Sequence, residues 1–214
     1  GHGELAMLIE WRFADRKLRV WKFAPDDPDA EPVLFNERSY NDAYNDPGQP
    51  VTTRSAFGTS VIHTIDGDTV LLAGEGASPE GNVPFLDRHD FTTGRSERVW
   101  RSEAPYYERV RDVLDDNGRR LLTLREARDE QPNFFIRDLS ENTLTQVSEF
   151  PHPHPQMTGI SKELIKYRRD DGVDLSGTLY LPPGYEEGDG PLPTLMWAYP
   201  LEYRDPSVAG QVRE

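Results

Sequence analysis

The sequence predicts a mainly β fold, and three observations indicate this class. Short segments alternate apolar and polar residues, as half-buried strands do. Turn signals rich in Gly, Asp and Asn separate these segments. The pattern also repeats, since Leu71 matches Leu121 at a shift of 50 and Val99 matches Val147 at a shift of 48. Four strands in each unit of ~45–50 residues are typical of β-propeller blades, so we expect a partial propeller of four-stranded antiparallel blades.

The first group of expected strands covers residues 4–12, 17–24 and 32–36. A long polar loop at 38–53 separates this group from the next, and its Pro and Gly residues fit irregular structure better than a strand. This group therefore aligns less closely with the other two.

The second and third groups share one plan of consecutive antiparallel strands. Asp66-Gly67 in the second and Asn117-Gly118 in the third are hairpin turn signals. The expected strands lie at 60–65, 69–73, 84–91 and 96–101 in the second group, and at 108–114, 119–125, 133–139 and 143–149 in the third.

Two alternatives compete with this interpretation. An antiparallel sandwich or meander with accidental similarity would show the same alternation, and residues 103–113 (EAPYYERVRDV) also fit a helix. Two or three blades cannot close a ring, which takes about four to eight. We therefore expect an incomplete propeller within this sequence.

Blade periodicity ends at the proline-rich run FPHPHPQMT, because alternating prolines cannot join a central strand. We divide the chain into propeller blades at 1–150, a Pro/His-rich linker at 151–162 and the start of a second domain at 163–214.

The second domain is expected to open with a hairpin of strands at 163–169 and 175–181. The apolar run 195–198 (LMWA) then reads as a strand buried on both faces. Tyr199 and Pro200 form a corner directly after it.

The composition excludes several classes of function. The net charge is −14, which disfavours binding to nucleic acid or to an anionic membrane surface. Cysteine is absent, so disulfides, zinc–thiolate sites and thiol catalysis are excluded. No apolar run approaches the ~18 residues of a membrane-spanning helix. The first residues (GHGELAML) show no initiator Met and no signal peptide, so the compartment stays open.

No G-x-S-x-G nucleophile motif is present; Ser60 and Ser161 fit ordinary turn serines. His152 and His154 would lie on one side of an extended segment, which suits a metal, but a stiff linker is the simpler interpretation. His63 and His89 fall within blade strands and fit packed or surface side chains.

Acidic clusters such as Asp115-Asp116 and Asp170-Asp171 lack the ligand spacing of calcium loops, and turn chemistry explains them. Gly74-Glu75-Gly76 places a carboxylate where a phosphate would bind, so a phosphate loop is disfavoured.

Residues 168–185 (RRDDGVDLSGTLYLPPGY) resemble the opening of the catalytic domain in prolyl-oligopeptidase-type serine peptidases. The glutamyl endopeptidase branch of that family is similar in further runs: PHPHP at 151–155, GPLP at 190–193, MWAYP at 196–200 and AGQVR at 209–213. The resemblance covers about 151–214, and upstream only the blade pattern is shared.

This resemblance implies a two-domain enzyme, in which a β-propeller caps an α/β-hydrolase domain and admits only peptides or unfolded segments. The hydrolase would use a Ser-His-Asp triad to cleave peptide bonds, without a cofactor or metal. In the family all three triad residues lie beyond the point that corresponds to residue 214, so this segment alone is expected to be inactive. Its partners would be a peptide substrate and the remainder of the hydrolase domain.

The resemblance also implies one catalytic residue. Related enzymes use a Tyr after the third hydrolase strand to donate its hydroxyl to the oxyanion, and Tyr199 is the matching position. The alternative is that Tyr199 packs at a turn. A preference for Glu would need a cation near the pocket, and Arg204, Arg213 or an arginine of the blades could supply it.

Two other functions stay open: a propeller-type binding module without catalysis, and a non-peptidase acyl hydrolase. An arc of blades also leaves open sheet edges, so the segment expressed alone is expected to be poorly soluble or oligomeric.

Overall fold

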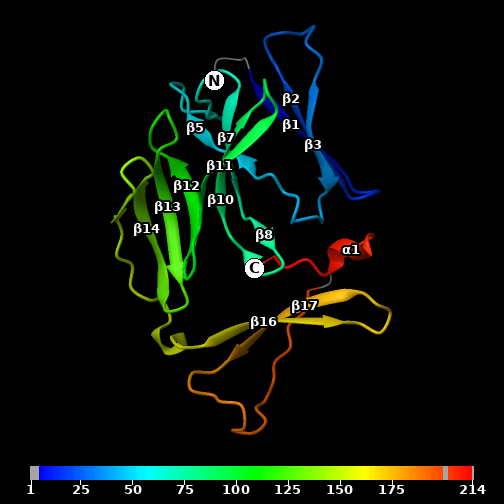
Figure 1. Cartoon of the computed structure of the whole chain (residues 1–214), viewed down its shortest axis with the longest axis vertical. Coiled ribbons are helices and arrows are strands. Elements are labelled where there is room, and N and C mark those ends of the chain that lie inside the picture. Colours follow the sequence, from blue (N-terminus) through cyan, green and yellow to red (C-terminus); the bar gives the residue numbers. More distant parts are fainter. Residues whose placement is uncertain (1–4, 200–201, 214) are drawn as a thin grey trace.

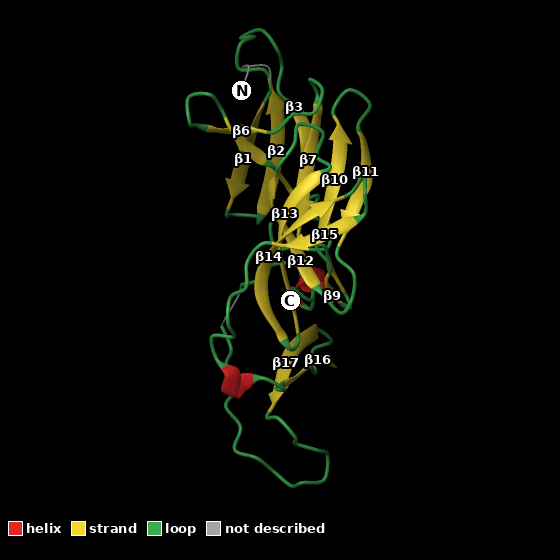
Figure 2. Cartoon of the chain, turned by 90° about the vertical axis from the view of Figure 1, so that its left-hand side faces the viewer, coloured by secondary structure: helices red, strands yellow, loops and turns green. Residues whose placement is uncertain are grey.

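The computed structural model of the chain describes residues 5–199 and 202–213 (Figure 1). It is nearly all strand, and its three larger sheets hold three, four and four strands. These sheets gather at one end of the molecule, and the β16–β17 hairpin lies at the other (Figures 1 and 2). In the described residues, neither short helix has the length and apolar composition that crossing a membrane requires.

The third sheet matches the predicted blade strand for strand. Its order is β12-β13-β14-β15, all antiparallel, which confirms the prediction of four-stranded blades. The strands are β12 (Tyr107–Val113), β13 (Arg120–Ala127), β14 (Glu130–Asp138) and β15 (Thr143–Gln146). The helical alternative for 103–113 is wrong, because β12 pairs along its length with β13 and gains a ladder that an isolated helix would lack.

The second sheet has the order β11-β10-β7-β4 and also holds four strands. They are β4 (Gln49–Pro50), β7 (Thr69–Gly74), β10 (Phe85–Asp90) and β11 (Arg95–Arg101). The prediction that 60–65 forms its first strand is wrong for residues 60–62. β6 (Ser60–Ile62) pairs with β5 (Thr52–Arg54) in a separate hairpin.

That hairpin interrupts the first strand of the second sheet. Gln49 pairs with Ala73 on β7, and the strand resumes where Thr64 pairs with Val70. The amide of His63 donates to the carbonyl of Val51 over 2.9 Å, which closes the insertion at its base. The hairpin β8 (Ala77–Ser78) and β9 (Gly81–Asn82) is a second insertion, between β7 and β10.

The first sheet has three strands, β1 (Ala6–Arg12), β2 (Lys17–Phe23) and β3 (Val33–Ser39). Among the described residues β1 pairs with β2 alone, so one of its edges is open. Leu8, Ile9 and Trp11 on β1 are exposed, which is consistent with the expected tendency to associate.

The main core lies between the second and third sheets. Leu71 and Leu86 from the second sheet pack against Val113 and Leu121 from the third, and three of the four have no exposed surface. Gly118 permits this contact, because a Cβ there would lie 2.6 Å from Leu71 Cδ1. The sheets therefore stack face to face, as neighbouring blades do.

The predicted second domain begins as a hairpin. β16 (Ser161–Arg168) pairs in full register with β17 (Asp174–Leu181), close to the predicted bounds. The 3-10 helix η1 (Pro155–Met157) lies between β15 and this hairpin.

The prediction of a buried strand at 195–198 is wrong. Residues 191–199 form no strand, and Leu195 and Trp197 are 92% and 85% exposed. A strand buried on both faces needs paired neighbours and covering layers. No described strand pairs with this run, and the segment 182–199, orange in Figure 1, loops away from the sheets.

Candidate functional site

The C-terminal segment 202–213 packs against the loop 40–48, which joins the first and second sheets. Gln211 makes two hydrogen bonds there: its Oε1 accepts from the amide of Ala43 over 2.7 Å, and its Nε2 donates to Asp42 Oδ1 over 2.8 Å. Burial raises the pKa of the Asp42 carboxyl, but hydrogen bonds from the Asn45 and Gln211 side chains outweigh it and lower that pKa below its ordinary value.

Apolar burial and main-chain contacts extend this interface. Val208 and Val212 are buried, and the amide of Val212 donates to the Tyr44 hydroxyl over 2.9 Å. The guanidinium of Arg213 donates to the carbonyl of Asn41. We call the contact between 202–213 and the turn and loop residues of the first sheet the clasp.

Arg16 anchors the other end of the clasp. It sits in the turn between β1 and β2 with φ +60°, and only 5% of it is exposed. Its guanidinium donates to the Tyr40 hydroxyl over 2.7 Å and to Glu202 over 3.0 Å, and it lies 3.9 Å from the centre of the Phe13 ring. A propeller turn and the C-terminal segment thus share one buried cation.

The helix α1 (Pro206–Ala209) lies within the clasp. Asp205 caps it by accepting from the amide of Ser207 over 2.9 Å. Gly210 follows and lies directly against β17, since a Cβ there would be 2.4 Å from the carbonyl oxygen of Asp174. The clasp therefore also fixes the hairpin of the second domain.

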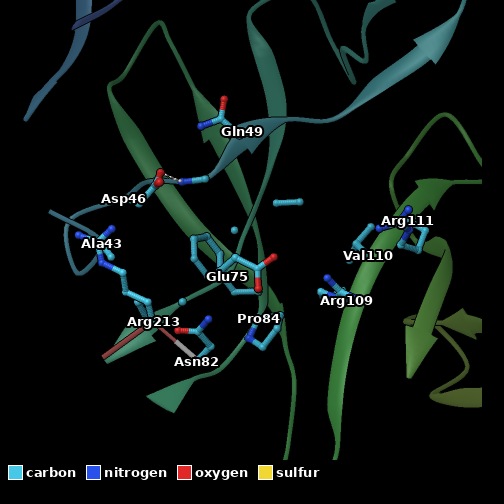
Figure 3. Close-up of a pocket in the computed structure, with 16 residues that line it drawn as sticks. Ala43, Asp46, Gln49, Glu75, Asn82, Pro84, Arg109, Val110, Arg111 and Arg213 are labelled. Carbon is cyan, nitrogen blue, oxygen red and sulfur yellow. Dashed lines mark hydrogen bonds between the residues drawn. The ribbon is translucent and has the colours of Figure 1, made fainter. Parts of the chain in front are cut away.

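A cavity of about 330 Å³ lies where the clasp meets the second and third sheets (Figure 3). We call it the junction cavity. Arg109, Val110 and Arg111 on β12 stand at one side, Arg213 at the other, and Glu75 between them (Figure 3).

Strand β12 carries a β-bulge at Arg111, one of its two cavity arginines. Val110 pairs with Thr123 and Asp112 with Leu122, so Arg111 is the extra residue of a β-bulge. A bulge breaks the strict alternation of a strand and redirects side chains. Arg109 and Arg111 both line the cavity together with the intervening Val110.

The two carboxylates of the cavity have dedicated partners. Asp46 pairs with Arg38 over 2.6 Å and accepts from the amide of Gly48 over 3.0 Å. Glu75 accepts a short hydrogen bond from the Tyr107 hydroxyl. Burial first, and then this hydrogen bond, raise the pKa of Tyr107 to about 12.

The residues predicted from sequence lie in different places. Tyr199 is 78% exposed and does not line the junction cavity. Arg204 and Arg213 are both exposed; Arg204 donates to the carbonyl of Ala14, and Arg213 lines the cavity. The oxyanion role of Tyr199 stays a prediction.

The histidines have local roles. The His154 amide donates to His152 Nδ1 over 3.0 Å, and no group of three His, Asp or Glu side chains suited to a metal occurs within residues 5–199 and 202–213. His89 contacts Ser96 Oγ over 2.8 Å, and burial lowers its pKa against the opposing charge of Asp90. His63 is buried.

Sequence reasoning did not identify Arg109, Arg111 or Glu75 as partners in one cavity. The available signal was two arginines flanking one apolar residue in a blade's first strand. Strand alternation places both arginines on one face, but it does not show that this face borders a cavity with Glu75 and Arg213.

The chain is similar in sequence to two plant proteins over 98% of its length. It is 44% identical to the "Probable glutamyl endopeptidase, chloroplastic" of Oryza sativa subsp. japonica and 41% identical to the protein of the same name in Arabidopsis thaliana. These matches confirm the resemblance seen in the sequence. The chain spans about a quarter of these relatives, 24% and 23%.

No family model matches the chain. Among solved structures it is similar to the unliganded AtxE2 isopeptidase, at 13% identity and a TM-score of 0.47, over 87% of this chain and 25% of the other. It is also similar to the β-propeller domain of the Trilobed protease from Pyrococcus furiosus, at 13% identity and a TM-score of 0.35, over 87% of this chain and 54% of that domain.

Proposed function

We propose that this chain is a segment of a serine peptidase of the prolyl oligopeptidase type, from its glutamyl endopeptidase branch. The observation that carries the proposal is the sequence identity above 40% to two proteins with that name, over 98% of this chain. The whole enzyme cleaves peptide bonds through a Ser-His-Asp triad, and this sequence holds no G-x-S-x-G motif that could supply its nucleophile.

In this proposal the blades and the second domain act as one body around the site. The clasp supports it, because Arg16 and the loop 40–48 bind the same C-terminal segment that contacts β17. A fixed junction lets the blades limit which substrates reach the second domain.

Tyr199 is the proposed oxyanion donor. It directly follows the apolar run 195–198 (LMWA), which is exposed here. Residues at the carboxyl end of a strand point into the active site of an open α/β sheet. A phenolic hydroxyl there would donate to the negative charge that develops on the scissile carbonyl oxygen.

The proposed preference for Glu requires a cation, and Arg204 and Arg213 are the two C-terminal candidates. Both side chains are exposed; Arg204 donates to the Ala14 carbonyl, and Arg213 lines the junction cavity. Arg213 is therefore the better candidate of the two.

Labelling with a fluorophosphonate tests the proposed chemistry, because this probe reacts with an activated serine. The full-length protein that contains this chain should be labelled, and prior incubation with a glutamyl peptide should slow the reaction. A correctly folded full-length protein that is never labelled would contradict the serine mechanism and favour a binding module.

A further inference from the structure

We propose that the junction cavity is a binding site for a carboxylate group of a peptide. That the ligand is a peptide rests on the proposed function, whereas the affinity for a carboxylate rests on the cavity itself. Its components come from β12, from the turn after β7 and from the C-terminal segment.

The charges of the cavity favour an anion. Asp46 is neutralised by Arg38, and Glu75 is held by the Tyr107 hydroxyl. By contrast, Arg109, Arg111 and Arg213 form no ion pair with any described residue. Three arginines therefore line the cavity without a carboxylate partner among residues 5–199 and 202–213.

Arg109 is the most constrained of the three. Its guanidinium lies 5.3 Å from the centre of the Tyr107 ring, and its Nε is buried without a hydrogen-bond partner. A buried donor without a partner is destabilising, and a bound acceptor would remove that cost. The guanidinium of Arg213 donates one hydrogen bond to the Asn41 carbonyl, and its other N–H groups could donate to a ligand.

The shape of the cavity depends on small residues. A Cβ on Gly74 would lie 2.5 Å from the Phe85 ring, and one on Gly76 would lie 2.0 Å from the Val83 carbonyl oxygen. The two glycines therefore let this wall pack closely against Phe85 and Val83. A volume of about 330 Å³ is at the low end of ligand sites, which span ~300–1,000 Å³.

A carboxylate fits better than a phosphate. Guanidinium groups bind carboxylates through two parallel hydrogen bonds. The neighbouring carboxylates of Glu75 and Asp46 would repel a dianion more strongly than a single negative charge. A glutamyl side chain and a free peptide C-terminus both provide this group.

Fluorescence anisotropy with three labelled peptides tests the site in the full-length protein. All three have N-methylated backbones, which resist hydrolysis, so binding is measured apart from activity. One carries Glu and an amidated end, one carries Gln and a free carboxyl end, and one carries Gln and an amidated end. We expect at least one anionic peptide to bind about tenfold more tightly than the neutral one, and the stronger of the two identifies the source of the carboxylate.

The variants Arg109→Gln, Arg111→Gln and Arg213→Gln should each reduce that preference severalfold. Arg128→Gln is the matched control, because Arg128 is exposed in the turn between β13 and β14, away from the cavity. Arg111 is exposed as well, so its variant tests the site with little risk to folding, and thermal melting checks all four.

Equal binding of all three peptides, or an unchanged preference in the Arg111→Gln and Arg213→Gln variants, would overturn the proposal. An arginine-dependent preference in a protein that no fluorophosphonate labels would keep the carboxylate site and reject the peptidase. Labelling and hydrolysis without any such preference would keep the peptidase and reject the carboxylate site.

Discussion

Arg16 Nη2 lies 3.0 Å from Glu202 Oε2, so a turn of the first sheet binds a residue 186 positions later in the chain. The two partners differ in environment: the Arg16 side chain is 6% exposed and that of Glu202 is 84% exposed. Arg16 is thus buried in the folded propeller, whereas Glu202 is a solvated residue of the C-terminal segment that binds it.

This asymmetry predicts unequal effects of the two partners on stability. Arg16→Met removes the donor to both Tyr40 and Glu202 from a buried position, and should lower the free energy of unfolding by ~1–3 kcal/mol. Glu202→Gln removes a solvated charge and should change it little. Urea denaturation of the full-length protein measures both. Equal losses in the two variants would contradict the assignment of Arg16 as the anchor.

The packing of the second sheet on the third predicts a contrast between two glycines. Gly118 and Gly94 both have φ +69°, so Ala at either position should cost roughly 1–2 kcal/mol of backbone strain. A Cβ at Gly118 also meets Leu71 at 2.6 Å, while one at Gly94 meets nothing within 4 Å. Gly118→Ala should therefore lose a further ~1–3 kcal/mol from overpacking. The same loss for both variants in thermal melts would mean that the two sheets do not pack as described.

The Tyr107 hydroxyl predicts a loss of stability at high pH. Its pKa of about 12 in the folded protein exceeds the ordinary 10.0, because burial and then the hydrogen bond to Glu75 favour the protonated phenol. Below pH ~10 the phenol is protonated in both states, and its contribution to stability is fully present. As the pH rises towards ~12, the unfolded chain releases a proton that the folded chain retains, so stability falls.

Tyr107→Phe should remove this part of the pH dependence. The free energy of unfolding, measured at about pH 9 and about pH 11, should fall less steeply in this variant than in the wild type. Tyr180→Phe is the control, because Tyr180 is 59% exposed on β17. Identical slopes for Tyr107→Phe and the wild type would show that burial and the hydrogen bond to Glu75 do not raise the pKa of Tyr107 in the folded protein.

The proposed oxyanion role of Tyr199 predicts a defect in catalysis. In the full-length protein, Tyr199→Phe should lower kcat by ~10²-fold or more and change KM little, since the hydroxyl acts on charge that develops in the transition state. Tyr167→Phe provides a matched control on β16, where the side chain is 54% exposed. A wild-type kcat in Tyr199→Phe would leave this residue as a packing group at a turn.

Local signals were sufficient to predict most strands. The turn at Asp115–Gly118 illustrates why, since Asp115 Oδ1 accepts from the amides of both Arg119 and Arg120 over 2.8 Å. Such a turn forms from neighbouring residues and sets the register of the hairpin around it.

Pairing between distant segments was not predictable in the same way. Residues 49–51 and 60–62 both have strand character, and only the ladder along β7 shows that the first belongs to the second sheet while the second forms an inserted hairpin. The run 195–198 is apolar enough for a buried strand, but it is exposed. Its burial depends on neighbouring strands that the described residues do not supply. Arg213 could be suspected from sequence, whereas the cavity that it shares with Arg109 and Arg111 could not.

Hydrolysis of two matched peptides by the full-length protein tests the central claim most directly. The peptides differ only in Glu or Gln at one position, and kcat/KM is measured for each. We predict cleavage after Glu with a kcat/KM at least about tenfold above that for Gln, and loss of both activities after fluorophosphonate treatment. A folded full-length protein that hydrolyses neither peptide would contradict the assignment of this chain to a glutamyl peptidase.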